Sequence, residues 1–337
     1  LSTMAQLGLP VPPGFVITTE VCRLYLERGK ELPPGLMDRV REAVGRLESR
    51  TGKGFGDHSN PLLVSVRSGA AVSMPGMMDT VLNLGLNDRT VEGLSVKTGD
   101  DRFAYDSYRR FIQLYGHIVM GISEETFSDA LERIKESVGV ELDVQLDTLA
   151  LKRMVREFKG IVEREAGEPF PQDPYRQLER AIEAVFRSWM GRRAVNYRKR
   201  FNITPDHADG TAVNVVTMVF GNMGDRSGSG VVFTRDPATG EKGLYGDYLR
   251  NAQGEDVVAG IRTPKPVSRL SEEMHGVYQE LLDMTEVLEG HYKVPQDIEF
   301  TVEEGDLYLL QTRGAKMNAV AWVTSSVDMV EEGVIDR

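Results

Sequence analysis

Cysteine is almost absent from this sequence, whose 337 residues include only Cys22. A single cysteine excludes an internal disulfide framework and a cysteine-rich zinc site. No run of 18 apolar residues occurs, so a membrane-spanning helix is not expected. The amino-terminal residues also lack the charged and then apolar pattern of a secretory signal peptide. These absences together predict a cytoplasmic protein.

Positive charge is also in short supply, because 51 acidic side chains face 40 basic ones and leave a net charge of −11. Phosphate backbones and anionic lipids repel such a chain, so neither a nucleic acid nor a membrane is expected as a partner. A basic stretch between residues 187 and 200 alternates with apolar residues. We interpret it as a helix whose charged face is solvated or contacts an acidic neighbour.

Several well-known catalytic motifs are missing. No GxxxxGK[ST] segment occurs, which excludes a P-loop nucleoside triphosphatase. No GxGxxG fingerprint occurs either, so a Rossmann dinucleotide site has no support. The five histidines show no metal-ligand spacing such as HExxH, and no GxSxG nucleophile elbow is present. Any chemistry must therefore come from other residue types.

The pattern of apolar residues predicts an α/β (α+β) fold with a helical insertion. Apolar and β-branched runs predict strands at 15–18, 62–67, 212–220, 230–234, 298–302 and 307–312. Between residues 87 and 199 the apolar period changes to 3.6, which indicates helices. We therefore expect four parts, namely residues 1–86, a mostly helical insertion at 87–205, residues 206–318, and a linker that begins at 319–337.

The first residues read as the last turns of a helix that is closed by Gly8. The start of that helix is missing from the sequence. We therefore expect the chain to be a fragment that begins inside a structural element.

A glycine-rich segment lies between two predicted strands. Within residues 221–230 it contains Gly221, Gly224, Ser227, Gly228, Ser229 and Gly230. Glycines let backbone N–H groups approach a ligand closely, and such loops cradle phosphates. The alternative interpretation is a flexible hairpin loop.

The last predicted hairpin carries two pairs of polar residues. Asp297 and Glu299 are two apart, so both side chains point to one face of their strand. Gln311 and Arg313 have the same spacing on the return strand. A loop of odd length, such as a three-residue turn with Gly305 in a left-handed conformation, would put all four on one face.

This arrangement suits a metal-bound polyphosphate. Mg²⁺ takes one or two carboxylates together with phosphate oxygens, and Arg313 would offer a planar fork to a phosphate. A solvated face of an edge hairpin is the alternative interpretation. Arg67, at the end of an earlier predicted strand and followed by Ser68, is also placed to reach anionic oxygens, although a surface ion pair is the alternative there. The methionine-rich residues 73–80 would form a mobile flap.

These segments resemble the pyruvate phosphate dikinase family. The similarity covers nearly the whole chain and is carried by residues 8–15, 65–69, 74–80, 221–237, 251–258 and 296–300. The methionine-rich segment and residues 233–237 distinguish the chain from the related phosphoenolpyruvate synthases. The resemblance implies an amino-terminal nucleotide-binding domain with an ATP-grasp fold.

The resemblance also implies an overall reaction. Enzymes of this family interconvert ATP, phosphate and pyruvate with AMP, pyrophosphate and phosphoenolpyruvate. They use Mg²⁺, a phosphorylated histidine on a swivelling domain and a pyruvate-binding barrel, and the full-length enzyme is expected to be a homo-oligomer. The phosphohistidine segment and a Gly-Gly-Lys-Gly segment that would precede Leu1 are absent here. We therefore expect the chain to bind Mg-ATP without completing the reaction.

Individual residues take roles from the same resemblance. Asp297 and Glu299 are similar to the metal-binding carboxylates, and Arg67, Gln311 and Arg313 to catalytic contacts of the polyphosphate. The glycine segment would cover the phosphates. Further nucleotide contacts are implied for Ser68, Gly76, Met218, Val219 and Phe220, the last three as an adenine-side hinge.

Two other interpretations stay open at this point. The chain could belong to a related dikinase, such as phosphoenolpyruvate synthase or an antibiotic or glucan dikinase. It could also be a catalytically silent module that binds a nucleotide or regulates another protein.

Overall fold

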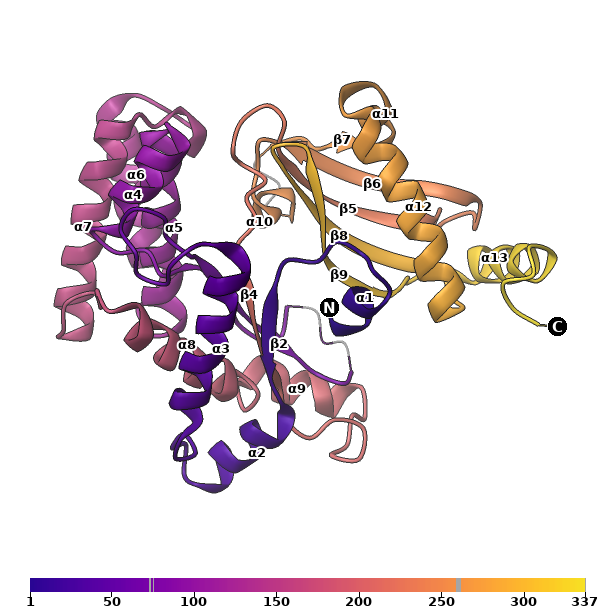
Figure 1. Ribbon diagram of the computed structural model, residues 1–337, viewed down its shortest axis with the longest axis horizontal. Coiled ribbons are helices and arrows are strands. Elements are labelled where there is room, and N and C mark those ends of the chain that lie inside the picture. Colours follow the sequence, from indigo (N-terminus) through magenta and orange to yellow (C-terminus); the bar gives the residue numbers. More distant parts are fainter. Residues whose placement is uncertain (73, 75, 259–261, 337) are drawn as a thin grey trace. The chain divides into compact units, whose positions relative to one another are not determined.

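The chain folds into two compact units of mixed helix and sheet. The computed structural model describes residues 1–72, 74, 76–258 and 262–336 (Figure 1). Unit 1 consists of Leu1–Pro12 and Val219–Arg337, and unit 2 consists of Pro13–Met218. The predicted α/β class is confirmed, whereas the four-part division of the sequence stays a prediction.

Unit 2 contains a four-stranded antiparallel sheet with the order β1-β4-β2-β3. Its strands are β1 (Gly14–Ile17), β2 (Val64–Gly69), β3 (Thr80–Leu84) and β4 (Ala212–Thr217). Strand β4 follows the helical region in the sequence and yet lies between β1 and β2. The helical region is therefore an insertion between strands of one sheet.

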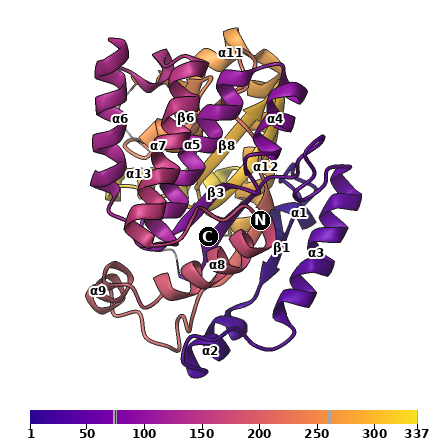
Figure 2. The same cartoon turned by 90° about the vertical axis from the view of Figure 1, so that its left-hand side faces the viewer.

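Eight helices belong to the described part of unit 2. They are α2 (Thr19–Glu27), α3 (Leu36–Thr51), α4 (Thr90–Thr98), α5 (Asp101–Ile118), α6 (Glu124–Val138), α7 (Thr148–Ala166), α8 (Pro174–Ser188) and α9 (Arg192–Arg200), with a 3₁₀ turn at Asp143–Gln145. Helices α4 to α7 pack against one another (Figure 2). The predicted helical region is thus confirmed.

The helices of unit 2 follow simple sequence rules. The side chains of Asp100, Asp147 and Asp173 cap α5, α7 and α8 by accepting hydrogen bonds from backbone N–H groups of the first turn. The predicted apolar stripe of α7 is buried along its length, from Leu151 to Val162. No helix in the described residues is long and apolar enough to span a membrane.

Unit 1 contains a five-stranded antiparallel sheet with the order β7-β6-β5-β8-β9. The strands are β5 (Gly228–Arg235), β6 (Lys242–Arg250), β7 (Lys265–Pro266), β8 (Gln296–Glu303) and β9 (Asp306–Gly314). The helices are α1 (Ser2–Gln6), α10 (Gly254–Val258), α11 (Leu270–Glu273), α12 (His275–Tyr292) and α13 (Ala319–Glu331), with a 3₁₀ turn at Val267–Arg269.

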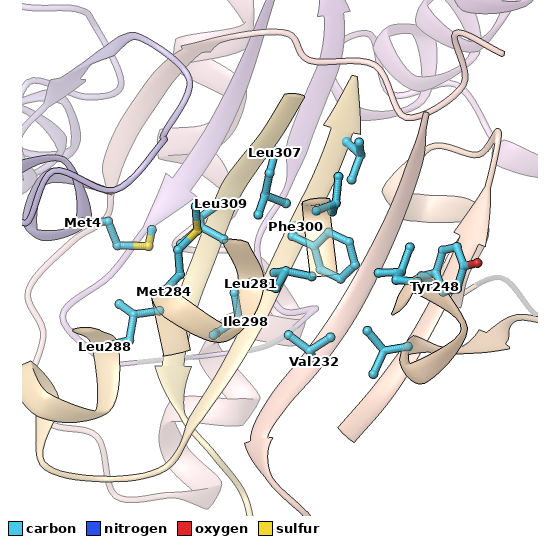
Figure 3. Close-up of a cluster of buried hydrophobic side chains, with 14 residues drawn as sticks. Met4, Val232, Tyr248, Leu281, Met284, Leu288, Ile298, Phe300, Leu307 and Leu309 are labelled. Atoms are coloured by element: carbon cyan, nitrogen blue, oxygen red, sulfur yellow. The ribbon is translucent and has the colours of Figure 1, made fainter. Parts of the chain in front are cut away.

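The core of unit 1 lies between its sheet and helix α12. Ile298, Phe300 and Val302 alternate along β8 and are buried, as predicted, against Leu281 and other residues of α12 (Figure 3). Met4 of α1 belongs to the same cluster. This packing fixes one face of β8 in the core, so that Asp297 and Glu299 point to the other face.

A buried arginine joins β5 to helices α12 and α13. Arg235 is fully buried, and its guanidinium donates hydrogen bonds to Glu289 at 3.0 Å and to Glu332 at 2.8 Å. Burial alone would raise the pKa of the Glu332 carboxyl, but the hydrogen bonds from Arg235 and Lys242 hold it below its usual value. The arginine therefore neutralises the buried carboxylate of Glu289 and also pairs with Glu332, whose side chain is 27% exposed.

We predict that Arg235→Ala lowers the free energy of unfolding by about 3–5 kcal/mol, because the buried carboxylate of Glu289 loses the cation that compensates its burial. Urea denaturation followed by circular dichroism measures this loss. Arg269→Ala is the matched control, because Arg269 forms an exposed ion pair with Glu272 in the same unit and its removal costs about 0–1 kcal/mol. Equal losses for the two variants would contradict the prediction.

Candidate functional site

The β8–β9 hairpin brings four of the predicted metal and polyphosphate residues together. Asp297 lies directly opposite Arg313, and Glu299 lies directly opposite Gln311. Residues that are directly opposite in an antiparallel pair share a face. The expectation that all four side chains occupy one face of unit 1 therefore agrees with the register of the strands.

The common face arises in a different way from the one expected. The turn contains only Glu304 and Gly305, with φ of 51° and 102°, so the predicted odd-length loop is wrong. An even loop alone would pair Glu299 with Leu310. The register instead shifts between Glu299 and Phe300, which leaves Leu310 as the extra residue of a β-bulge. The bulge turns Gln311 and Arg313 to the side of the carboxylates.

Asp297 has one satisfied carboxylate oxygen and one unsatisfied oxygen. Arg313 Nε donates to Asp297 Oδ2 at 2.7 Å, and the Asp297 side chain is 8% exposed. Its Oδ1 is buried and has no hydrogen-bond partner among the described residues. A buried oxygen without a partner is costly unless a ligand supplies one. The atom therefore fits the position of a cation ligand.

The donor set is incomplete for a metal that only protein side chains hold. In the described ranges of the chain, no group of three or more His, Cys, Asp or Glu residues is arranged to bind a metal. Magnesium requires no such group, since it takes one or two carboxylates and completes its shell with water and phosphate oxygens. Asp297 and Glu299 fit that requirement.

The glycine-rich segment is divided between a loop and a strand. Strand β5 begins at Gly228, so the loop ends at Ser227, earlier than predicted. A Cβ atom on Gly230 would lie 2.6 Å from the Phe300 ring, and one on Gly228 would lie 2.8 Å from the Leu249 carbonyl oxygen. These two glycines allow β5 to pack closely, and their contact with a nucleotide stays a prediction.

The two serines of the segment have partners inside unit 1. Ser229 Oγ and Thr301 Oγ1 are 3.0 Å apart and hydrogen-bonded. Ser227 Oγ accepts a hydrogen bond from Glu304 N at 3.0 Å, which ties the loop to the β8–β9 turn. A direct contact of either serine with a nucleotide also stays a prediction.

Segment 250–252 holds the remaining loop, residues 221–227. Ala252 N donates to the Gly221 carbonyl oxygen at 2.8 Å, and Gly224 N donates to Asn251 Oδ1 at 3.2 Å. Gly224 itself has φ of 92°. Asn251 is not among the predicted site residues, and the resembling segment 251–258 is the only part of the sequence pattern that points to it.

The predicted adenine-side hinge spans the boundary between the two units. Met218 ends unit 2, where its backbone N–H donates to Leu63 O at 2.8 Å. Val219 begins unit 1, and Phe220 N donates to the Glu303 carboxylate in that unit. The backbone N–H groups of Met218 and Phe220 are thus held by neighbours, and the contact of residues 218–220 with adenine stays a prediction.

Arg67 and its neighbours belong to unit 2. Arg67 lies in β2 between Thr80 of β3 and Asn214 of β4, is half-buried, and donates from Nε to Ser65 Oγ at 3.1 Å. Ser68 follows it in the same strand. The phosphate role of both residues stays a prediction.

The predicted methionine-rich flap is only partly described, because residues 73 and 75 lie outside the described residues. Met74 is buried, and Gly76 is exposed with φ of 68°. Arg193 donates to Asp79 Oδ1 at 3.0 Å, while burial raises the pKa of the Asp79 carboxyl. The mobility of this segment stays a prediction.

We predict that Gly230→Ala lowers the free energy of unfolding by about 1–3 kcal/mol, because the added methyl group must displace the Phe300 ring. Thermal denaturation without any nucleotide measures this effect. Gly290→Ala is the matched control, because nothing lies within 4 Å of a Cβ at this exposed position of α12. The control is expected to gain about 0.5–1 kcal/mol. A Gly230→Ala variant as stable as the wild type would count against a packing role.

Comparison with known proteins identifies strong similarity along the whole chain. The family model for the "Pyruvate phosphate dikinase, AMP/ATP-binding domain" matches residues 29–277 and 269–333. "Pyruvate, phosphate dikinase" of Entamoeba histolytica is 56% identical over 339 residues and that of Clostridium symbiosum 53% over 336. "Pyruvate, phosphate dikinase, chloroplastic" of Mesembryanthemum crystallinum is also 53% identical over 336 residues.

The matches cover the chain much more fully than they cover the relatives. They include 100%, 99% and 100% of this chain, but only 38%, 38% and 35% of the three relatives, respectively. The chain therefore spans less than two fifths of the length of these relatives.

Proposed function

Because the chain belongs to the pyruvate phosphate dikinase AMP/ATP-binding domain family, we propose that it binds Mg-ATP through the polar face of the β8–β9 hairpin. The observation that carries this proposal is the buried Asp297 Oδ1, which has no partner among the described residues and lies beside Glu299 on the same face. Gln311 and Arg313 from the opposite strand supply donors for phosphate oxygens.

The proposed site needs concentrated positive charge because the chain as a whole carries a net charge of −11. Asp297 and Glu299 would hold Mg²⁺, which supplies positive charge to the phosphates when it is bound. Arg313 is already oriented by its hydrogen bond to Asp297. Arg313 would neutralise charge on the transferred phosphoryl group, and a phosphate-contacting role is proposed separately for Arg67 of unit 2.

The complete reaction would require parts beyond this chain. In the proposed half-reaction, a histidine nitrogen of a swivelling domain attacks the β-phosphorus of ATP. The bond between that phosphorus and the oxygen bridging to the α-phosphorus breaks, which releases AMP and leaves a pyrophosphorylated histidine. Inorganic phosphate then takes the terminal phosphoryl group, and pyrophosphate leaves. The remaining phosphoryl group would pass to pyruvate in a separate barrel domain and form phosphoenolpyruvate.

The setting of the full-length protein also belongs to this proposal. The length of the relatives leaves room for the swivelling domain and the barrel. We propose a cytoplasmic homo-oligomer whose ligands are ATP, AMP, phosphate and pyrophosphate. The single cysteine supports a reducing compartment.

We predict that Asp297→Asn weakens Mg-ATP binding by at least about tenfold, because a neutral amide is a poor magnesium ligand. Isothermal titration calorimetry with and without Mg²⁺ measures the change. Asp306→Asn is the matched control, since Asp306 is an exposed carboxylate on the same hairpin. The titration is repeated on a version extended at its amino terminus. Absence of binding by both wild-type versions would refute the nucleotide proposal.

A second prediction concerns Arg67 in the full-length protein. Arg67→Ala is expected to slow the ATP–phosphate half-reaction about 10²-fold, as expected for the loss of one preorganised donor to developing charge. Isotope exchange between pyruvate and phosphoenolpyruvate should stay unchanged. Arg50→Ala removes an exposed arginine of α3 and serves as the control. Equal loss of both half-reactions would contradict this role of Arg67.

A further inference from the structure

Hydrogen bonds attach the loop of residues 221–227 to a neighbouring segment at several points along its length. We call residues 250–252 the bracing segment. It contacts the loop by four hydrogen bonds, which are Ala252 N to Gly221 O, Asn251 N to Ser227 O, Arg250 Nε to Asp225 O, and Gly224 N to Asn251 Oδ1. Three of these bonds occupy carbonyl oxygens of the loop. Only the bond to Asn251 Oδ1 occupies a loop N–H.

Asn251 is suited to this position for two independent reasons. Its backbone has φ of 49°, a left-handed conformation that asparagine tolerates better than most residues with a side chain. Its carboxamide oxygen accepts the N–H of Gly224, which itself has φ of 92°. Arg262 in turn donates to the carbonyl oxygens of Asn251 and Arg250 at 2.9 and 2.8 Å. The hydrogen bonds from Arg262 therefore fix the backbone of the bracing segment.

The other side of the loop is attached to the β8–β9 turn. Ser227 Oγ accepts the hydrogen bond from Glu304 N, and this turn leads directly into the strands of the proposed metal site. Among the described residues, the backbone N–H groups of Met223, Asp225 and Arg226 donate no hydrogen bond within the chain. These three donors surround the residue that Asn251 holds.

We propose that Asn251 is a positioning residue for the nucleotide site. By holding Gly224 N–H, it fixes the loop in a shape that leaves the N–H groups of Met223, Asp225 and Arg226 available to a polyphosphate. Successive backbone N–H groups in a turn form a concave donor site for anions, and Asp225 and Arg226 supply two in succession directly after Gly224. This inference rests on the proposed binding of Mg-ATP.

The role proposed for Asn251 concerns only one part of ATP. The loop donors serve the β- and γ-phosphates, which AMP lacks. Loss of the hydrogen bond from Gly224 N would let the loop sample other shapes, and the donors would then have to be ordered when ATP binds. The affinity for ATP should therefore fall, while the affinity for AMP should not.

The test uses Asn251→Gly, which keeps the left-handed backbone and removes the carboxamide. Asn251→Asp keeps an acceptor oxygen. Asn202→Gly is the matched control, because Asn202 is an exposed asparagine with φ of 52° in unit 2. Amide hydrogen exchange of Gly224 is measured by NMR without nucleotide, and titration calorimetry measures binding of Mg-ATP and of AMP.

We expect Asn251→Gly to speed the exchange of Gly224 N–H and to weaken Mg-ATP binding about two- to tenfold, with AMP binding unchanged. Asn251→Asp should keep Gly224 N–H protected, and Asn202→Gly should change neither quantity. Unchanged exchange in Asn251→Gly, or an equal loss of ATP and AMP affinity, would overturn the role of Asn251 alone. Absence of nucleotide binding by the wild type would overturn the proposed function and this role with it.

Discussion

The charge balance at Asp297 is the constraint around which the hairpin of unit 1 is built. Ile298 and Phe300 are buried on one side of β8, so the carboxylate between Gln296 and Ile298 is fixed on the other side. Arg313 compensates one of its oxygens and leaves the second without a partner among the described residues. The cost of burying that oxygen is retained in the folded chain, and a bound cation would recover it.

Much of the fold follows from local sequence patterns. The alternation along residues 297–302 predicts which side chains of β8 enter the core, and the apolar stripe of residues 151–162 predicts the buried face of α7. The same alternation predicts that Asp297 and Glu299 share a face. These features depend on residues that are close in sequence, so their period is enough to find them.

The rest depends on contacts between distant parts of the chain. The bulge at Leu310 arises from the pairing of β9 with β8, and the residues of the turn do not predict it. Gly230 reads as part of a flexible loop until Phe300, seventy positions further on, is placed against it. The role of Asn251 can be inferred only once its side chain is placed beside Gly224. In each case the local pattern fits more than one structure, and a partner remote in sequence selects among them.

The assignment of residues 1–12 to unit 1 has a consequence for the order of folding during synthesis. Met4 packs in the core with Val232, Ile298 and Leu309, although all of unit 2 separates it from them in the sequence. Every residue of unit 2 leaves the ribosome before the sheet of unit 1 exists. Unit 2 can therefore complete its fold first, before residues 1–12 can pack against the rest of unit 1. Pairing of β1 with β4 places Gly14 opposite Val216 and so brings the two ends of unit 2 together, which shortens the loop that unit 1 must close.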